Sequence, residues 1–192
     1  NKACLQSWSG SMFEYLMPLL MLKTPEGTLY QQSMVLSVER QQSYGRLRSV
    51  PWGVSESAYS GRDRHLTYQY SSFGVPGLGL KRGLGDELVV SPYATALAAM
   101  IMPGQARRNF ARLAELGVRG TFGFYEAIDF TPERLRPHEH HEVVQAYFAH
   151  HQGMTVTALH NAVTAGALRN YFHRENIVRA AELLLQERAP SY

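Results

Sequence analysis

Apolar residues recur at helical spacing along much of the chain. One stripe runs through Phe110, Leu113, Ala114 and Gly117, and another through Ile177, Ala180, Ala181, Leu184 and Leu185. A period near 3.6 residues indicates amphipathic helices. A hydroxyl residue stands directly before proline at Thr24, Ser91 and Thr131, which favours helix starts because the hydroxyl caps free amides and proline tolerates the first helical position. The pattern predicts helices over residues 11–22, 26–46, 92–102, 104–116, 141–165 and 174–187.

Two segments, 50–90 and 117–137, break this pattern. They are rich in glycine, proline and aromatic residues and show too little alternation of apolar and polar positions to predict a sheet. We therefore expect long ordered loops in both places. Loops of this length in a compact domain are usually functional, because their irregular backbone must find other hydrogen-bond partners to stay folded.

Length and composition set the class of protein. The chain has 192 residues, about one domain, of which 45% are hydrophobic and 18% charged, so a disordered or collagen-like chain is excluded. The eleven tyrosines suggest a polar cleft lined by flat aromatic rings. The single cysteine, Cys4, cannot form an internal disulfide, and nothing requires an oxidising compartment.

Charge and hydropathy argue against two classes of partner. The formal net charge of +3 comes from arginines and lysines spread without a basic run, so we expect a solvated surface and no nucleic acid. The apolar stretches fall far short of the ~20 residues that span a bilayer, and Pro18 interrupts the first of them. We predict no membrane segment and no signal peptide. Because residue 1 is asparagine and a motif-like stretch begins by Trp8, we expect the chain to be a fragment of a longer protein.

Four acidic residues lie in surroundings unusual for a surface charge: Glu14, Glu56, Glu126 and Asp129. Glu56 follows Trp52 and precedes Tyr59, two aromatic residues that can shield a carboxyl from water and raise its pKa, as suits a general acid. Two carboxyls that face a bound sugar are the usual requirement for glycosidic bond cleavage. Taken singly, each of these acids has a structural alternative, a helix cap or an arginine pair.

The glycine-rich segment 73–83 looks at first like a phosphate cradle. It lacks the dinucleotide spacing and the lysine-serine ending of a P-loop. We therefore expect a tight loop whose amides are satisfied internally, and no nucleotide. Asp63 lies between Arg62 and Arg64; it is interpreted first as a structural pair and second as a residue that holds a sugar hydroxyl.

Histidines are concentrated in residues 138–141 and 150–151, but neither group has the zinc-helix spacing of two histidines four apart with an adjacent glutamate. We predict no metal and no cofactor. On a helix, Val144, Phe148, His151 and Thr155 share one face, so His151 is interpreted first as a satisfied core histidine and second as a substrate ligand. No Gly-x-Ser-x-Gly elbow supports a Ser-His-Asp triad.

Seven motifs occur in a series between about residue 7 and residue 162. They are the segments 7–18, 52–59, 68–70, 74–81, 91–95, 125–129 and 150–154. This series resembles the glycoamylase-like domain of cyclic β-1,2-glucan synthases, which is related to endo-β-1,2-glucanases. The resemblance implies an all-α fold, an (α/α)6 toroid of paired helices around a cleft. The six or seven predicted helices are about half of the twelve such a toroid needs, so the chain, residues 1–192, looks like the C-terminal half.

The resemblance also implies an activity. Related domains cleave or transfer β-1,2-glucan chains through acidic residues, and the motif positions assign the catalytic role to Glu56 and Glu126. Substitutions such as Ser11 for threonine and Val54 for isoleucine remove no acid, whereas the missing upstream half has further acids that could supply a catalytic partner. The resemblance places the parent multidomain enzyme at the cytoplasmic side of the bacterial inner membrane.

Glucan is the partner that the resemblance implies, together with the remaining half of the domain. The residues predicted to bind it are Trp52, Tyr59, Asp63, Tyr70, Phe124, Tyr125, Asp129, His151 and Gln152. Sugar rings present C–H patches that lie well against aromatic faces, although core packing is the competing account, above all for Phe124. The alternative function is a fragment that binds glucan, or braces its parent enzyme, without catalysis.

Overall fold

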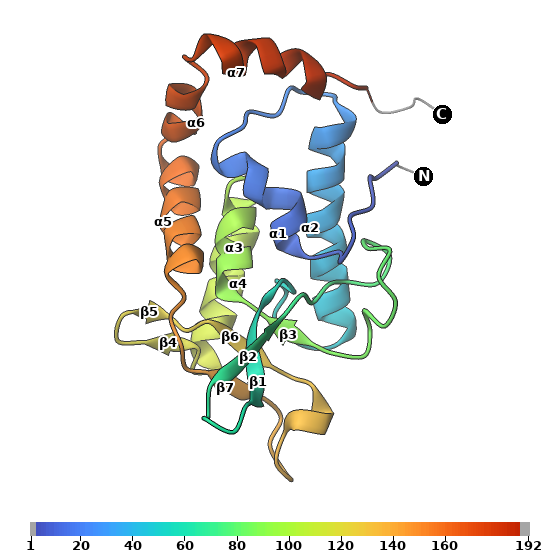
Figure 1. Ribbon diagram of the computed structural model, residues 1–192, viewed down its shortest axis with the longest axis vertical. Helices are drawn as coiled ribbons and strands as arrows, with labels where there is room; N and C mark the ends of the chain where they lie inside the picture. Colours follow the sequence, from blue (N-terminus) through green and yellow to red (C-terminus); the bar gives the residue numbers. More distant parts are fainter. Residues whose placement is uncertain (1–2, 189–192) are drawn as a thin grey trace.

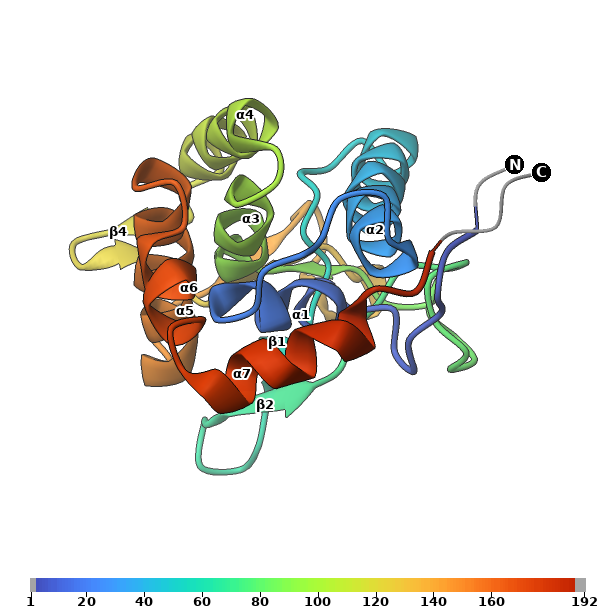
Figure 2. The same cartoon turned by 90° about the horizontal axis from the view of Figure 1, so that it is seen from above.

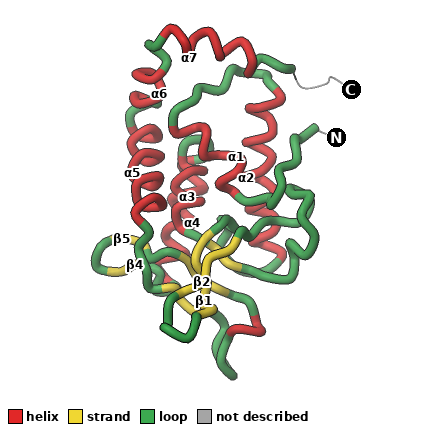
Figure 3. Tube along the Cα trace, in the orientation of Figure 1, coloured by secondary structure: helices red, strands yellow, loops and turns green. Residues whose placement is uncertain are grey.

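The computed structural model describes residues 3–188. Its helices gather at one end of the molecule and its short strands at the other (Figures 1 and 3). The α-helices in this range are α1 (Met12–Leu16), α2 (Leu29–Leu47), α3 (Pro92–Ala99), α4 (Pro103–Glu115), α5 (Ala149–Val163), α6 (Ala167–Phe172) and α7 (Asn176–Ala181), with 3-10 turns at Met17–Leu20, Pro132–Arg134 and Glu182–Leu185.

Helix α3 forms the centre of the core. All eight of its residues are buried, and it packs against α1, α4 and α5. Five of the eight are alanine or threonine, small residues that let neighbouring helices approach closely. Seen from above (Figure 2), α2, α4, α5 and α7 are arranged around α1 and α3. The buried cluster extends from this helix to the strands through Val89, Val90 and Ile128.

The strands form three small antiparallel sheets. The hairpin of β1 (Ser57–Arg62) and β2 (Tyr68–Ser71) is one, and β4 (Arg119–Gly120) with β5 (Gly123–Phe124) is another. The third has the order β3-β6-β7, formed by Val89–Val90, Ala127–Asp129 and Glu142–Val144. Strand β1 packs against β6 and β7, so the hairpin lies on the three-stranded sheet.

The helix predictions are confirmed for most of the chain. The predicted segments 26–46, 92–102 and 104–116 coincide with α2, α3 and α4 to within three residues at each end. The first differs at its start, because Thr28 rather than Thr24 caps α2 by accepting the amide hydrogen of Gln31. Ser91 precedes α3 without capping it and instead donates to the carbonyl of Glu126 at 2.6 Å.

Two expectations about strands are wrong. The segments 50–90 and 117–137 carry six of the short strands, and the predicted helix 141–165 begins as β7, with α5 starting only at Ala149. Strands of two to six residues offer too few positions for a period of two to appear. In β7 the pairing of Val144 with Ala127 satisfies the backbone, and a helix there would lose it. The fold is therefore helix-rich with small sheets rather than purely helical.

The glycine-rich segment 73–83 is a tight loop, as expected. Its amides donate within the chain: Val75 to the carbonyl of Gly10 at 3.1 Å, Leu80 to Ser7 at 3.1 Å and Lys81 to Trp8 at 2.9 Å. Gly74 lies against this N-terminal segment so closely that a Cβ on it would stand 1.6 Å from the carbonyl oxygen of Ser9. The loop needs glycine because two backbones meet there.

Replacing Gly74 with alanine is expected to lower the free energy of unfolding by at least ~1–3 kcal/mol, because the loop and the Ser7–Gly10 segment must separate. Gly153 is the matched control, since it lies inside α5 and a Cβ added to it would meet nothing within 4 Å. Gly153→Ala should leave stability unchanged or raise it by up to ~1 kcal/mol. Urea unfolding of both variants measures the difference in stability. Equal urea midpoints for Gly74→Ala and Gly153→Ala would contradict the close packing of Gly74 against the Ser7–Gly10 segment.

Candidate active site

Glu56 lies directly before strand β1, with its side chain half-buried. The hairpin register pairs Ala58 with Tyr70, and this brings the Tyr70 hydroxyl within 3.2 Å of Oε1 of Glu56, to which it donates. The carbonyl of Glu56 accepts a hydrogen bond from the Tyr93 hydroxyl at 2.9 Å. Backbone and side chain of Glu56 are therefore both held by tyrosines.

Glu126 lies directly before strand β6, and its side chain is fully buried. Its Oε1 accepts the amide hydrogen of Ala58 at 3.2 Å. Both carboxyl oxygens face Nδ1 of His151, at 2.8 and 3.0 Å. A buried charge is stable only when it is paired and hydrogen-bonded, and these contacts meet that requirement.

His151 is contributed by the first turn of α5 and is 1% exposed. Its ring stacks on Tyr93 with a centroid distance of 3.8 Å, and its Nε2 lies 3.4 Å from the Tyr70 hydroxyl. Phe148 stacks on Tyr70 at 5.8 Å, so His151 points toward the residue on which Phe148 packs, as predicted. The predicted helix face itself does not form, because Val144 lies in β7 and Phe148 is the extended residue before α5. His151 is a satisfied core histidine, in agreement with the first interpretation of its sequence position.

A continuous row of polar contacts thus joins Glu56, Tyr70, His151 and Glu126, which are separated by up to 95 positions in the sequence. Burial, followed by the nearby carboxyl of Glu56, raises the pKa of Tyr70 well above its ordinary value. Burial does the same to the pKa of Tyr93. Both tyrosines are therefore neutral hydrogen-bonding groups at any physiological pH.

Three further predicted residues gather beside this row. Phe124, Tyr125 and Gln152 line a cavity of about 120 Å³ together with Glu126 and His151. The Gln152 side-chain amide donates to the carbonyl of Phe124 at 3.2 Å. The ring of Phe124 also packs on Phe110 and that of Tyr125 on Tyr147, with centroid distances of 5.0 and 5.1 Å. These aromatics combine a packing role with a position at the cavity.

Trp52 and Tyr59, the aromatics that flank Glu56 in sequence, lie apart from this cavity. Trp52 is 7% exposed in the core, and its backbone exchanges two hydrogen bonds with the side chain of Asn109, at 3.1 and 2.7 Å. Tyr59 packs edge-on against Phe73 and beneath the guanidinium of Arg134. Neither placement supports the predicted role as a wall that shields the carboxyl of Glu56, because Trp52 is buried in the core and the ring of Tyr59 packs on Phe73 and Arg134.

Asp63 is exposed at the turn of the β1–β2 hairpin. Its Oδ1 accepts the amide hydrogens of His65 at 2.8 Å and Thr67 at 3.0 Å. Among the ion pairs of residues 3–188, none joins Asp63 to its flanking arginines. The structural pair suggested by the sequence is therefore a turn cap instead, and a contact with a sugar hydroxyl stays a prediction.

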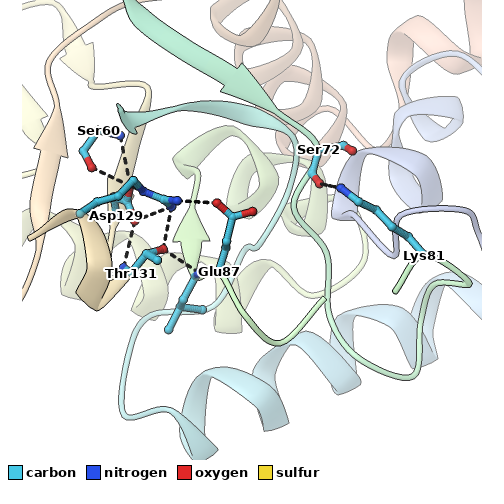
Figure 4. A network of polar contacts seen from close by, with 8 residues as sticks. Ser60, Ser72, Lys81, Glu87, Asp129 and Thr131 are labelled. Atoms are coloured by element: carbon cyan, nitrogen blue, oxygen red, sulfur yellow. Dashed lines mark hydrogen bonds and ion pairs between the residues drawn. The ribbon is translucent and has the colours of Figure 1, made fainter. Parts of the chain in front are cut away.

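Asp129 is fully buried at the centre of a polar network (Figure 4). Its Oδ2 accepts the amide of Ser60 at 3.1 Å, the hydroxyl of Ser60 at 2.8 Å and Nε of Arg134 at 2.7 Å; its Oδ1 accepts the amide of Thr131 at 3.0 Å. Arg134 also pairs with Glu87. With both oxygens occupied by the chain itself, Asp129 has the contacts of a structural residue, and its predicted binding of glucan has no support in this arrangement.

Tyr93 belongs to the motif at 91–95, but its sequence position indicates no particular role. The structure places its ring on His151 and its hydroxyl on Ser55 at 2.7 Å and on the Glu56 carbonyl. Glu14, one of the four acids in unusual surroundings, is held by the serines at positions 7, 9 and 11 and closes the capping box of α1. The alternative of a helix cap is therefore the correct interpretation of Glu14.

Within residues 3–188, no group of three or more histidine, cysteine, aspartate or glutamate side chains is arranged to hold a metal ion. In the same range, no helix has the length and apolar character needed to cross a membrane.

The Glycoamylase family model matches residues 1–176. The chain belongs to the Glycoamylase family. It is also 51% identical over 189 residues to the cyclic beta-(1,2)-glucan synthase NdvB of Rhizobium meliloti (strain 1021), a match that covers 98% of this chain and 7% of that protein. The chain thus spans a small fraction of this relative's length. The resemblance drawn from the sequence motifs is confirmed.

Solved structures share the fold of this Glycoamylase-family chain. An endo-beta-1,2-glucanase from Chitinophaga pinensis, in complex with sophorotriose and glucose, matches 95% of the chain with a TM-score of 0.65 and 20% identity, and the match covers 41% of that structure. A beta-1,2-glucanase from Parabacteroides distasonis matches 92% of the chain with a TM-score of 0.56 and 19% identity, over 24% of its own length. Both extend well beyond the matched part.

Trp52→Ala is expected to lower the free energy of unfolding by ~3–5 kcal/mol, because the side chain fills the core. Glucan affinity of the protein that remains folded should stay unchanged. Tyr125→Ala is the companion variant: its half-buried ring lines the cavity, so its loss should weaken binding more than it lowers stability. Thermal melting and glucan titration are both required. A sharp fall in glucan affinity for Trp52→Ala at unchanged stability would contradict this placement.

Asp129→Asn is expected to cost ~3 kcal/mol of stability at neutral pH, because it leaves Arg134 without its buried partner. Although burial of Asp129 opposes its ionisation, hydrogen bonds from Arg134 and Thr131 outweigh it and lower the pKa of the carboxyl. The stabilisation is therefore present above the unfolded pKa of ~3.9 and is lost as pH falls through the lower folded pKa. The difference between wild type and variant should shrink below about pH 4. Asp63→Asn, at an exposed turn, is the control. An equal loss of stability in Asp129→Asn and Asp63→Asn would contradict a stabilising ion pair between Asp129 and Arg134.

Proposed function

We propose that the chain is the acid-bearing part of a domain that cleaves or transfers β-1,2-glucan chains, within a larger enzyme of the cyclic β-1,2-glucan synthase kind. The observation that carries the proposal is the position of Glu56, a half-buried carboxyl held by the Tyr70 hydroxyl beside the buried Glu126–His151 pair. The 51% identity to a cyclic beta-(1,2)-glucan synthase supports the substrate class.

Glu56 acts in this proposal as the general acid that protonates the leaving glucosyl oxygen. Within residues 3–188 its Oε1 accepts the Tyr70 hydroxyl, while its Oε2 accepts no hydrogen bond from the chain. One oxygen is thus positioned by the protein and the other is free for the glycosidic oxygen. A general acid must reach the atom it protonates within hydrogen-bond distance, and partial exposure of Glu56 allows that.

The second carboxyl has two candidate sources. The motif at 125–129 assigns this role to Glu126, yet Glu126 is fully buried with both oxygens occupied. These contacts favour a role in which Glu126 holds His151, with the second catalytic acid supplied by chain outside residues 1–192. A separation of about 5–5.5 Å between the two catalytic carboxyls corresponds to a retaining reaction, and about 6.5–9.5 Å to an inverting one.

The complete domain in this proposal is an (α/α)6 toroid, and the chain supplies its later half. Large apolar side chains on the outer helices support further packing, since Val163, Ile177 and Leu184 are 81%, 81% and 84% exposed. Two of these, Ile177 and Leu184, belong to the apolar stripe found in the sequence. An exposed apolar surface of this kind marks an interaction site, and further helices of the same domain fit it. Location of the parent enzyme at the cytoplasmic side of the inner membrane stays a prediction.

Glu56→Gln in the complete domain should reduce cleavage of linear β-1,2-glucan by ~10²–10⁴-fold, because a positioned general acid contributes that much. The helical circular dichroism signal and the melting temperature should not change. Mass analysis of the products follows the reaction. Chain lengths that grow indicate transfer, and chain lengths that shrink indicate hydrolysis. Activity within about tenfold of wild type would rule out Glu56 as the acid and favour a fragment that binds glucan or braces its parent enzyme.

A further inference from the structure

The row formed by Glu56, Tyr70, His151 and Glu126 has a restricted set of proton positions. The Tyr70 oxygen lies 3.2 Å from Oε1 of Glu56 and 3.4 Å from Nε2 of His151, and Nδ1 of His151 lies 2.8 Å from Oε1 of Glu126. A tyrosine hydroxyl carries one proton, so it donates to one neighbour and accepts from the other. A carboxylate only accepts, so Nδ1 of His151 donates to Glu126.

Two arrangements satisfy every contact. In the first, Nε2–H of His151 donates to Tyr70 and Tyr70 donates to an ionised Glu56, so His151 is an imidazolium. In the second, Tyr70 donates to Nε2 of a neutral His151 and accepts from a protonated Glu56. Both arrangements contain the same number of protons and the same net charge of the four groups. They differ only in whether one proton resides on His151 or on Glu56.

We infer that Glu56, Tyr70 and His151 form a proton relay in which the proton that Glu56 delivers to the glycosidic oxygen is shared with His151 through the Tyr70 hydroxyl. In the relay step the Nε2–H bond of His151 breaks as a new O–H bond forms on Tyr70, and the former Tyr70 O–H proton moves to Oε1 of Glu56. A half-turn of the Glu56 carboxyl about its Cγ–Cδ bond then presents the protonated oxygen at the free position. There it gives the proton to the leaving oxygen, which keeps the electron pair of the broken C–O bond, while the incoming nucleophile bonds to the anomeric carbon. The inference rests on the proposed function of Glu56.

The surroundings favour this exchange. Glu126 fixes the ring of His151 from one side, and Tyr93 of α3 stacks on it at 3.8 Å. His150, the neighbouring imidazole, lies 4.0 Å from His151 by ring centroid, and its own partial burial, followed by the nearby His151, lowers the pKa of His150. The high pKa values of Tyr70 and Tyr93 keep both hydroxyls neutral. The mobile proton is therefore confined to His151 and Glu56.

Tyr70→Phe tests the relay in the complete domain, with Tyr68→Phe as the matched control. Tyr68 is on the same strand, but its hydroxyl contacts Arg62 and the amide of Gln145 instead of the row. Turnover of linear β-1,2-glucan is measured in mixtures of H₂O and D₂O. Two protons moving in the rate-limiting step make the rate depend on the deuterium fraction along a curve, and one proton makes the dependence a straight line.

We expect a curved dependence for wild type and Tyr68→Phe, and a straight line with a roughly tenfold lower kcat for Tyr70→Phe, a smaller loss than that of the acid itself. His151→Gln should also give a straight line, because its amide donates to Tyr70 but carries no mobile proton. A Tyr70→Phe variant that keeps the curve, while Glu56→Gln is inactive, overturns the relay and leaves the proposed function intact. An active Glu56→Gln overturns the proposed function instead.

Discussion

The buried carboxylate of Glu126 joins the parts of the molecule that form the candidate site. It binds the amide of Ala58 in β1 and the ring of His151 in α5, while its own backbone bonds to Ala146 and Ser91. Removing a partner from a buried charge costs several kcal/mol, because the remaining charge cannot recover its hydration. The hairpin that carries Tyr70, the helix that carries His151 and the loop that carries Glu56 therefore depend on one side chain for their mutual position.

Asp129, three residues after Glu126, is a second buried carboxylate that accepts a backbone amide of β1. Strands β1 and β6 belong to different sheets, and backbone hydrogen bonds do not connect them in the ladder. The carboxylates of Glu126 and Asp129 make the connection instead, by accepting the amides of Ala58 and Ser60. Glu126, to which the sequence motifs assigned a catalytic role, and Asp129, which was expected to bind glucan, thus attach the two sheets to each other. Glu126 also fixes His151, whose Nε2 lies 3.4 Å from the Tyr70 hydroxyl that holds Oε1 of Glu56.

The sequence predicted the features that depend on local pattern. Helical periodicity located α2, α3 and α4, and the glycine-rich segment was correctly expected to be a tight loop. The partners of its amides in residues 7–10 are distant in sequence and could not be predicted from local pattern. Features set by distant partners were missed. The strands near residues 57–71 owe their existence to pairing rather than composition. Trp52 is close to Glu56 in the chain but packs beside Asn109, 57 positions away, and no spacing rule reveals such a contact.

The most direct test of this account is the proton attached to Nδ1 of His151, observed by NMR in protein labelled with ¹⁵N on the imidazole rings. The account predicts a slowly exchanging Nδ1–H resonance that is lost in Glu126→Ala, where the amide proton of Ala58 also becomes exposed to exchange. Glu56→Gln, which leaves that carboxylate in place, should retain the Nδ1–H resonance. A His151 ring whose proton resides on Nε2 alone, or an Nδ1–H signal unchanged by removal of the Glu126 carboxyl, would contradict the central role of Glu126.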